Sequence, residues 1–80
     1  MRDKIPLEEV QKWLGKIKEE LENCSPTNRK GEEFLENINA YVSDSEHFLG
    51  KEDLFLSWEA VIWAFAFLTI GKDLGILTSD

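Results

Sequence analysis

Hydrophobic residues recur at steps of three and four positions along the first quarter of the chain. This spacing is typical of an α-helix with one apolar face. Charged residues fill the intervening positions, and pairs such as Glu8 with Lys12 have the i,i+4 spacing that stabilises a solvated helix surface. The apolar face comprises Leu7, Val10, Leu14, Ile17, Leu21 and Cys24. We therefore predict a first helix over about residues 4–23, with Asp3 as its cap.

A second apolar face follows a break in this periodicity. Pro26 and Asn28 both suit the start of a helix, so the pattern places that start only between Pro26 and Glu32. Gly50 is predicted to take the left-handed conformation that ends the helix. The face comprises Phe34, Ile38, Tyr41, Val42, Phe48 and Leu49. The second helix is therefore expected over about residues 28–49.

The most hydrophobic stretch of the chain predicts a third helix over about residues 53–74. Asp53 is expected to cap its start and Gly75 its end, with Ile76 folded back on the last turn and the residues after it frayed. The connection between the second and third helices is short, which makes them antiparallel neighbours. The predicted fold is all-α, an antiparallel three-helix bundle in which residues 1–80 form a single helical domain.

The third helix has more apolar surface than a bundle requires. Successive residues turn by about 100° around the axis, so each can be assigned to a face. A narrow polar stripe holds Glu59, Ala66 and Asp73, and almost opposite lies a row of small residues, namely Ser57, Ala60, Ala64 and Gly71. One bulky flank holds Leu54, Trp58, Val61, Phe65 and Leu68, and the other holds Leu56, Trp63, Phe67, Ile70 and Leu74. The apolar arc exceeds half the circumference, so a monomer is expected to leave part of one flank in water.

This apolar excess predicts an interaction module. We expect the chain to self-associate through the third helix as a homodimer or another homo-oligomer, or to bind an unknown protein partner. The alternative is a module that binds a small apolar ligand in a pocket lined by Trp58, Trp63, Phe65 and Phe67. The candidate interface residues are Trp63, Phe67, Ile70, Leu56 and Leu74, and the residues of the alternative flank or pocket are Trp58, Phe65, Phe55 and Ile62.

The charge of the chain narrows the class of partner. Sixteen acidic residues against nine basic ones give a formal net charge of −7, which disfavours nucleic acid and anionic membrane surfaces. A membrane span is not expected, because the apolar run from Leu54 to Ile70 is short and is interrupted by Glu59. The single cysteine cannot form an internal disulfide, and the N-terminus has no signal-peptide pattern. We expect a cytoplasmic protein.

The side chains that could support chemistry are scattered. His47 and Asp44 lie one helical turn apart, but a metal site needs further converging ligands. Cys24 continues the apolar face of the first helix, which favours a packed thiol over a nucleophile. Glu59 lies on the polar stripe, where a solvated carboxylate is expected. We therefore predict no enzyme activity, no cofactor and no metal.

The C-terminal half of the chain resembles a family of short archaeal proteins known as domain of unknown function 357. The resemblance rests on Tyr41, Phe48-Leu49-Gly50, Glu52-Asp53, Ala60, Ala64, Phe67-Leu68, Gly71 and Leu74-Gly75. The family often has Gly, Trp and Asp where this chain has Ala66, Phe67 and Thr69. The resemblance implies a compact helical protein and assigns no activity.

Overall fold

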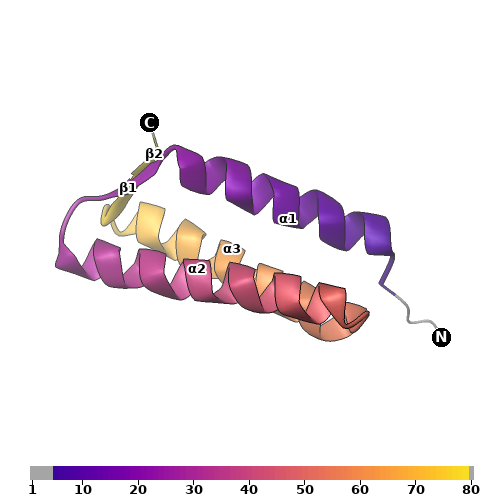
Figure 1. Ribbon diagram of the computed structural model, residues 1–80. Coiled ribbons are helices and arrows are strands. Elements are labelled where there is room, and N and C mark those ends of the chain that lie inside the picture. The colour runs from indigo at the N-terminus through magenta and orange to yellow at the C-terminus, as the bar shows by residue number, and fades with distance from the viewer. Residues whose placement is uncertain (1–4, 80) are drawn as a thin grey trace.

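Three helices and two short strands make up the computed structural model, which describes residues 5–79. The helices are α1 (Leu7–Glu22), α2 (Arg29–Gly50) and α3 (Leu54–Asp73), and the strands are β1 (Cys24–Pro26) and β2 (Leu77–Ser79). In Figure 1, α1 runs lengthwise over the antiparallel pair formed by α2 and α3, and both strands lie at one end of the bundle. The predicted all-α fold with three helices is confirmed. The predicted cap Asp3 lies outside the described residues.

The starts of α2 and α3 are set by side-chain caps. The Asn28 carboxamide oxygen accepts a hydrogen bond from the Gly31 backbone N–H at 2.9 Å, and the Asp53 carboxylate accepts one from the Leu56 N–H at 3.1 Å. Each bond satisfies an N–H that has no partner inside the first helical turn. The cap predicted at Asp53 is confirmed, and the start of α2 is now assigned to Asn28.

The end of α3 has the predicted geometry. Gly75 is left-handed with φ of 75°, its N–H donates to the Lys72 carbonyl at 3.1 Å, and the Ile76 N–H donates to the Gly71 carbonyl at 3.0 Å. This pair of bonds is a Schellman motif, in which the chain reverses over the last turn of the helix. Ile76 is thereby directed back onto the bundle, where it is buried.

The end of α2 differs from the prediction. Gly50 remains helical, and the left-handed residue is Glu52 with φ of 62°. The Glu52 N–H donates to the Leu49 carbonyl and the Asp53 N–H donates to the Phe48 carbonyl, at 3.0 and 2.9 Å. These bonds form a second Schellman motif two residues later than expected. The physical reason is that Asp53 both completes this motif and caps α3, which places the left-handed residue directly before it.

Residues Leu77–Ser79 form a strand, so the prediction that they fray is wrong, and Asp80 lies outside the described residues. Strand β2 pairs antiparallel with β1, with Pro26 opposite Leu77 and Cys24 opposite Ser79. Leu77 is buried in the core. The Thr27 hydroxyl donates a hydrogen bond to the Gly75 carbonyl at 2.9 Å, which holds the turn after α3 against the segment that follows β1. A pairing between segments about fifty residues apart is not visible in local periodicity, because its stabilisation comes from burial and from a distant strand.

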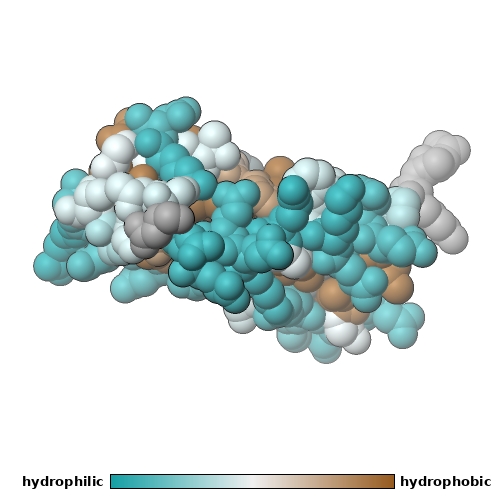
Figure 2. All heavy atoms as spheres, turned by 90° about the horizontal axis from the view of Figure 1, so that it is seen from above, coloured by the Kyte–Doolittle hydropathy of each residue, from teal (hydrophilic) through white to brown (hydrophobic). Residues whose placement is uncertain are grey.

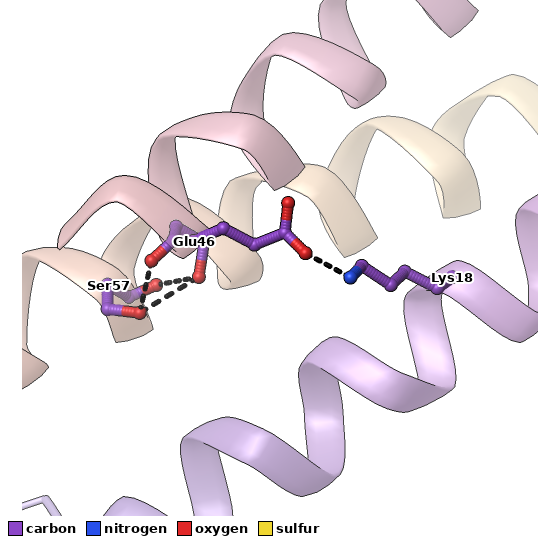
Figure 3. Close-up of polar contacts among 4 residues, drawn as sticks. Lys18, Glu46 and Ser57 are labelled. Carbon is purple, nitrogen blue, oxygen red and sulfur yellow. Dashed lines mark hydrogen bonds and ion pairs between the residues drawn. The ribbon is translucent and has the colours of Figure 1, made fainter. Parts of the chain in front are cut away.

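The core lies where the three helices meet. It contains Val10, Leu14 and Ile17 of α1, Ile38 and Val42 of α2, and Val61, Ala64 and Leu68 of α3, closed at one end by Ile76 and Leu77. The row of small residues on α3 is buried throughout. It lets α2 approach closely enough for Ser45 and Ser57 to hydrogen-bond across the two helices (Figure 3). These contacts determine which side of α3 faces inward.

Polar contacts hold α1 against the other two helices. Lys18 pairs with Glu46 of α2 (Figure 3), and Lys72 of α3 donates to the Glu20 carboxylate at 3.0 Å. Both pairs are partly exposed, so each contributes about 0–1 kcal/mol. Seen from above, the surface along α1 is mainly hydrophilic (Figure 2).

Candidate functional site

The exposed side of α3 carries most of the large hydrophobic side chains that remain in contact with water. Four of its residues and its C-cap residue are 47–65% exposed, namely Phe55, Ile62, Trp63 and Ile70 on the helix and Leu74 at the cap. They lie on both sides of the stripe formed by Glu59, Ala66 and Asp73, of which Glu59 and Asp73 are exposed and Ala66 is half-buried. Helices α1 and α2 cover the opposite side of α3, so this face is the candidate interaction surface.

The flank of α3 that borders α2 is the more exposed of the two. Trp63, Ile70 and Leu74 are exposed, whereas Leu56 and Phe67 are half-buried. These are the five residues that the sequence nominates as an interface. They are brought together along one edge of the α2–α3 pair.

The flank that borders α1 is largely covered. Trp58 and Phe65 are half-buried, and the Trp13 ring of α1 meets the Phe65 ring edge-on with centroids 5.6 Å apart. Phe55 and Ile62, which the sequence grouped with them, remain exposed. An open hollow of about 250 Å³ lies here, lined by Trp13, Trp58, Val61, Ile62 and Phe65.

The four aromatic residues predicted to line one pocket do not meet. Trp58 and Phe65 line the hollow beside α1, whereas Trp63 and Phe67 pack against Tyr41 of α2, with ring centroids 6.4 and 5.7 Å from the Tyr41 ring. The reason is that the two pairs lie on opposite flanks of α3, and the polar stripe and the packed small-residue row separate those flanks.

A row of aromatic rings runs along the edge between α2 and α3. Trp63 and Phe67 stack on Tyr41 with interplanar angles of 22°, and Phe67 meets Phe34 edge-on at 5.4 Å. The sequence placed Tyr41 and Phe34 on the core face of α2 and did not nominate them for the candidate surface. Their helical spacing was visible, but the contact with Trp63 depends on how the two helices are aligned.

A second hollow, of about 280 Å³, opens on this edge near the α2–α3 turn. Its lining consists of Tyr41, Asp44, Phe48, Leu56, Glu59, Ala60 and Trp63. The carboxylates of Asp44 and Glu59 are exposed, and neither has a hydrogen bond or ion pair with the residues that the structure describes. Two negative charges therefore lie beside Trp63, at the end of the row of aromatic rings that is nearer the α2–α3 turn.

The remaining polar candidates do not form a site. His47 is exposed on α2 and its ring meets Phe48 edge-on at 5.4 Å. Cys24 is a half-buried free thiol in β1. Across residues 5–79, no three His, Cys, Asp or Glu side chains are grouped so that they could hold a metal ion.

Helix α3 also has the length and composition of a membrane span. It is the one such helix among the described residues, with a mean hydropathy of 1.7, and 33% of its most apolar window is buried inside the protein. Core helices of soluble proteins share these features, so this finding is weak evidence for a membrane location.

Comparison with known proteins agrees with the fold. The sequence model of the family described as "Protein of unknown function (DUF357)" matches residues 8–77. The crystal structure of protein AF1782 from Archaeoglobus fulgidus, which carries the same family model, is 40% identical, with a TM-score of 0.84 and 92% of each chain covered. No curated protein matches the chain. The family match spans most of the sequence and the solved structure shares both sequence and fold, so the chain belongs to the DUF357 family of proteins of unknown function.

Proposed function

We propose that this protein is a small interaction module that self-associates through the exposed face of α3. The observation that supports this proposal is the set of four exposed large hydrophobic side chains on one helix of twenty residues, Phe55, Ile62, Trp63 and Ile70, with a fifth, Leu74, at its C-cap. Such a helix is about 30 Å long, and large exposed hydrophobic side chains gathered along one element of a protein mark interaction sites.

The strength of the proposed contact follows from how much of each side chain is exposed. Complete burial of a large apolar side chain is worth about 1.5–3 kcal/mol, so five half-exposed side chains would contribute about 4–7 kcal/mol per protomer. Association costs about 4–15 kcal/mol in lost freedom of motion. The two terms are of similar size, so the association is sensitive to single substitutions among the side chains that make the contact.

A small-ligand module is the alternative. Its support is the apolar hollow between α1 and α3, which is lined by three aromatic residues, Trp13, Trp58 and Phe65. The hollow measures about 250 Å³ and is open to solvent, whereas ligand pockets commonly measure about 300–1,000 Å³ and enclose most of the ligand. These dimensions favour self-association over ligand binding.

A catalytic role is not part of the proposal. Asp44, His47 and Glu59 are the side chains best suited to proton transfer on this part of the surface. All three are exposed, and none is held by a hydrogen bond within residues 5–79. Catalytic acids and bases are normally oriented by such bonds. The net charge of −7 likewise favours a protein partner over nucleic acid.

The oligomeric mass tests the proposal directly. Light scattering after gel filtration should give a mass well above 9.2 kDa at low micromolar concentration and a value that falls on dilution. A mass that stays at 9.2 kDa up to millimolar concentration would overturn self-association. Native mass spectrometry of protein purified from its source separates the alternative, because only a ligand-binding module should retain a bound apolar molecule.

A further inference from the structure

The hollow near the α2–α3 turn is built from the same arrangement of side chains on two helices. Each helix contributes one carboxylate, with an apolar side chain three positions before it and another four positions after it. Steps of three and four positions keep side chains on one face of a helix. The two sets are Tyr41, Asp44 and Phe48 on α2, and Leu56, Glu59 and Trp63 on α3.

The two carboxylates lie at nearly the same level along the pair of helices. Ser45 hydrogen-bonds with Ser57, so the residue before it, Asp44, is level with residue 58 of the antiparallel α3. Glu59 is within two positions of that level, which is at most about 3 Å along the axis. No basic residue lines the hollow, and neither carboxylate has a hydrogen bond or ion pair within residues 5–79. The hollow therefore presents two like charges without a counter-charge.

The surroundings of the hollow are also acidic. Between residues 44 and 59, acids outnumber bases five to one. The acids are Asp44, Glu46, Glu52, Asp53 and Glu59, and the base is Lys51. Interfaces form between patches of opposite potential, and such complementarity also speeds the encounter of the two partners. A group that carries positive charge is therefore the complementary occupant of the hollow.

The aromatic walls decide which kind of cation fits. The Trp63 ring stacks on Tyr41 and is 51% exposed, so part of its surface is open to a ligand. Aromatic faces attract organic cations. A hard metal ion such as Ca²⁺ instead takes six to eight oxygen ligands. The described part of the chain holds no group of three His, Cys, Asp or Glu side chains that could bind a metal.

The shape of the hollow favours a single arginine side chain. A guanidinium is planar, stacks on aromatic rings and carries five N–H donors, so it can reach two carboxylates at once, whereas an ammonium is a compact and strongly hydrated point charge. The hollow measures about 280 Å³ and is open to solvent. Pockets that enclose a whole small molecule commonly measure about 300–1,000 Å³. The buried Ala60 leaves room that a larger residue would fill.

We propose that this hollow binds an arginine side chain of a partner protein. The guanidinium lies on the exposed part of the Trp63 ring and donates hydrogen bonds to the carboxylates of Asp44 and Glu59. The methylene stem of the arginine contacts the apolar side chains that flank these two acids. The proposal does not rest on self-association, because it concerns a partner of different chemistry and a site that is complete within one protomer.

Titration with single blocked amino acids tests the chemistry of the hollow. Arginine acetylated at its amino end and methylamidated at its carboxyl end should shift the NMR signal of the Trp63 indole N–H, with a Kd of about 1–10 mM. The indoles of Trp13 and Trp58, which line the hollow beside α1, are internal controls and should shift much less. Blocked citrulline has the shape of arginine without its charge and should bind at least about tenfold more weakly.

Three results of this titration would overturn the proposal. The first is binding of blocked citrulline as tight as that of blocked arginine, which would mean that charge is not recognised. The second is a larger shift at Trp13 or Trp58 than at Trp63, which would place the ligand on the other flank. The third is equal binding of blocked lysine, which we expect to be at least about threefold weaker because it lacks the planar fork.

Two variants test the roles of the carboxylates. Asp44→Asn and Glu59→Gln should each raise the Kd for blocked arginine at least about fivefold, because each removes one charged acceptor. Glu36→Gln is the matched control, since it removes the same charge from an exposed position of α2 that does not line the hollow. It should change the Kd less than about twofold. Equal effects of the three variants would mean that only the overall negative charge matters and would overturn the site.

A second copy of the chain is a competing occupant, because it would also contact Trp63. Each titration is therefore repeated with Ile70→Lys, which weakens the proposed self-association and does not line the hollow. Binding of blocked arginine in neither form would overturn the proposal. Within residues 5–79, a second copy could supply only Arg29. If Arg29→Gln and Asp44→Asn raise the dimer Kd equally, the occupant is a second copy and the assignment to a different partner is wrong.

The two proposals fail in different ways. If the unmodified protein is monomeric at every concentration, self-association is wrong, whereas the arginine site is still decided by the titration. If the protein is dimeric but blocked arginine fails to bind, self-association stands and the arginine site is overturned. The helical circular dichroism of each variant shows that its fold is retained.

Discussion

Ser45 and Ser57 each donate a hydrogen bond from the side-chain hydroxyl to the backbone carbonyl of the other, at 2.8 and 2.7 Å (Figure 3). Both side chains are completely buried, and their hydroxyl oxygens lie 3.0 Å apart. Only a small residue on each helix allows so close an approach. This reciprocal pair fixes the alignment of α2 against α3, and with it the side of α3 that remains exposed.

Replacing either buried serine should destabilise the protein. Ser45→Ala and Ser57→Ala each remove one hydrogen bond between the helices, and each should lower the free energy of unfolding by about 1 kcal/mol. The double variant should cost less than the two single changes together, because the residues are in direct contact. Urea denaturation measures all three. Ser43→Ala, at an exposed position of α2, is the control and should change stability by less than about 0.5 kcal/mol. An equal effect at Ser43 and Ser45 would contradict the role assigned to the pair.

Two glycines inside helices should respond in opposite directions to substitution by alanine. A Cβ at Gly31 would overlap the Ile76 carbonyl oxygen and approach Pro26 Cβ at 3.1 Å, whereas a Cβ at Gly15 would meet no atom within 4 Å. Gly31→Ala should therefore displace the C-terminal segment and cost about 2 kcal/mol or more. Gly15→Ala should stabilise the protein by about 0.5–1 kcal/mol through the helix propensity of alanine. Thermal and urea unfolding report both changes, and a stabilised Gly31→Ala variant would show that the C-terminal segment is not packed against α2.

The two left-handed residues that follow α2 and α3 provide a matched pair. Glu52 has φ of 62° and Gly75 has φ of 75°, and both occupy the same position of a Schellman motif. Glu52→Gly should stabilise the protein by about 0.5–1 kcal/mol, because glycine adopts this conformation without steric cost. Gly75→Ala should destabilise it by about 1 kcal/mol, since a Cβ there meets no neighbour and only the backbone conformation resists it. Unfolding curves in which Glu52→Gly is destabilised would rule out strain at this turn.

Trp63→Glu should dissociate the oligomer and leave the protomer folded. Trp63 is 51% exposed, so a charge there can remain in water in a monomer but would be buried in an interface. Light scattering should show a shift toward 9.2 kDa, with little change in the helical circular dichroism signal. Loss of the helical signal would instead mean that Trp63 is required by the core of its own protomer.

Two isoleucines on α3 distinguish which flank is in contact. Ile62 is 47% exposed and Ile70 is 48% exposed, but they lie on opposite sides of the polar stripe. Ile70→Lys should raise the dimer Kd about tenfold or more, because it places charge on the more exposed flank, which borders α2, whereas Ile62→Lys should change it by less than about threefold. Analytical ultracentrifugation measures the dimer Kd of both variants, which carry the same isoleucine-to-lysine change at different positions. The reverse order would assign the interface to the flank that borders α1.

Local sequence features account for the fold with few exceptions. The three helices, the caps at Asn28 and Asp53 and the chain reversal at Gly75 all follow from interactions within a few residues along the chain. The left-handed residue after α2 was assigned to Gly50 on composition, but it is Glu52. The residue preference for a left-handed conformation favoured Gly50. The hydrogen bonds of Glu52 and Asp53 to the last turn of α2 instead place the left-handed residue at 52.

Only part of the candidate surface could be predicted from the sequence. Helical periodicity was enough to separate the polar stripe, the small-residue row and the two flanks of α3, because these depend only on the rotation per residue. Periodicity could not show which flank α1 would cover, nor that Tyr41 would stack on Trp63. These contacts depend on the crossing and alignment of separate helices.

The amino-acid sequence by itself thus determined the number of helices, most of their ends and the apolar excess of α3, since all of these arise from short-range geometry and residue type. Only the tertiary structure decided that Leu77–Ser79 is a strand and that the Trp63 flank is the more exposed one. It also decided that Asp44 and Glu59 line one hollow with Trp63 on this edge. The physical reason is that strand pairing, burial and the alignment of helices depend on groups distant in the chain, whose proximity exists only once the core has formed.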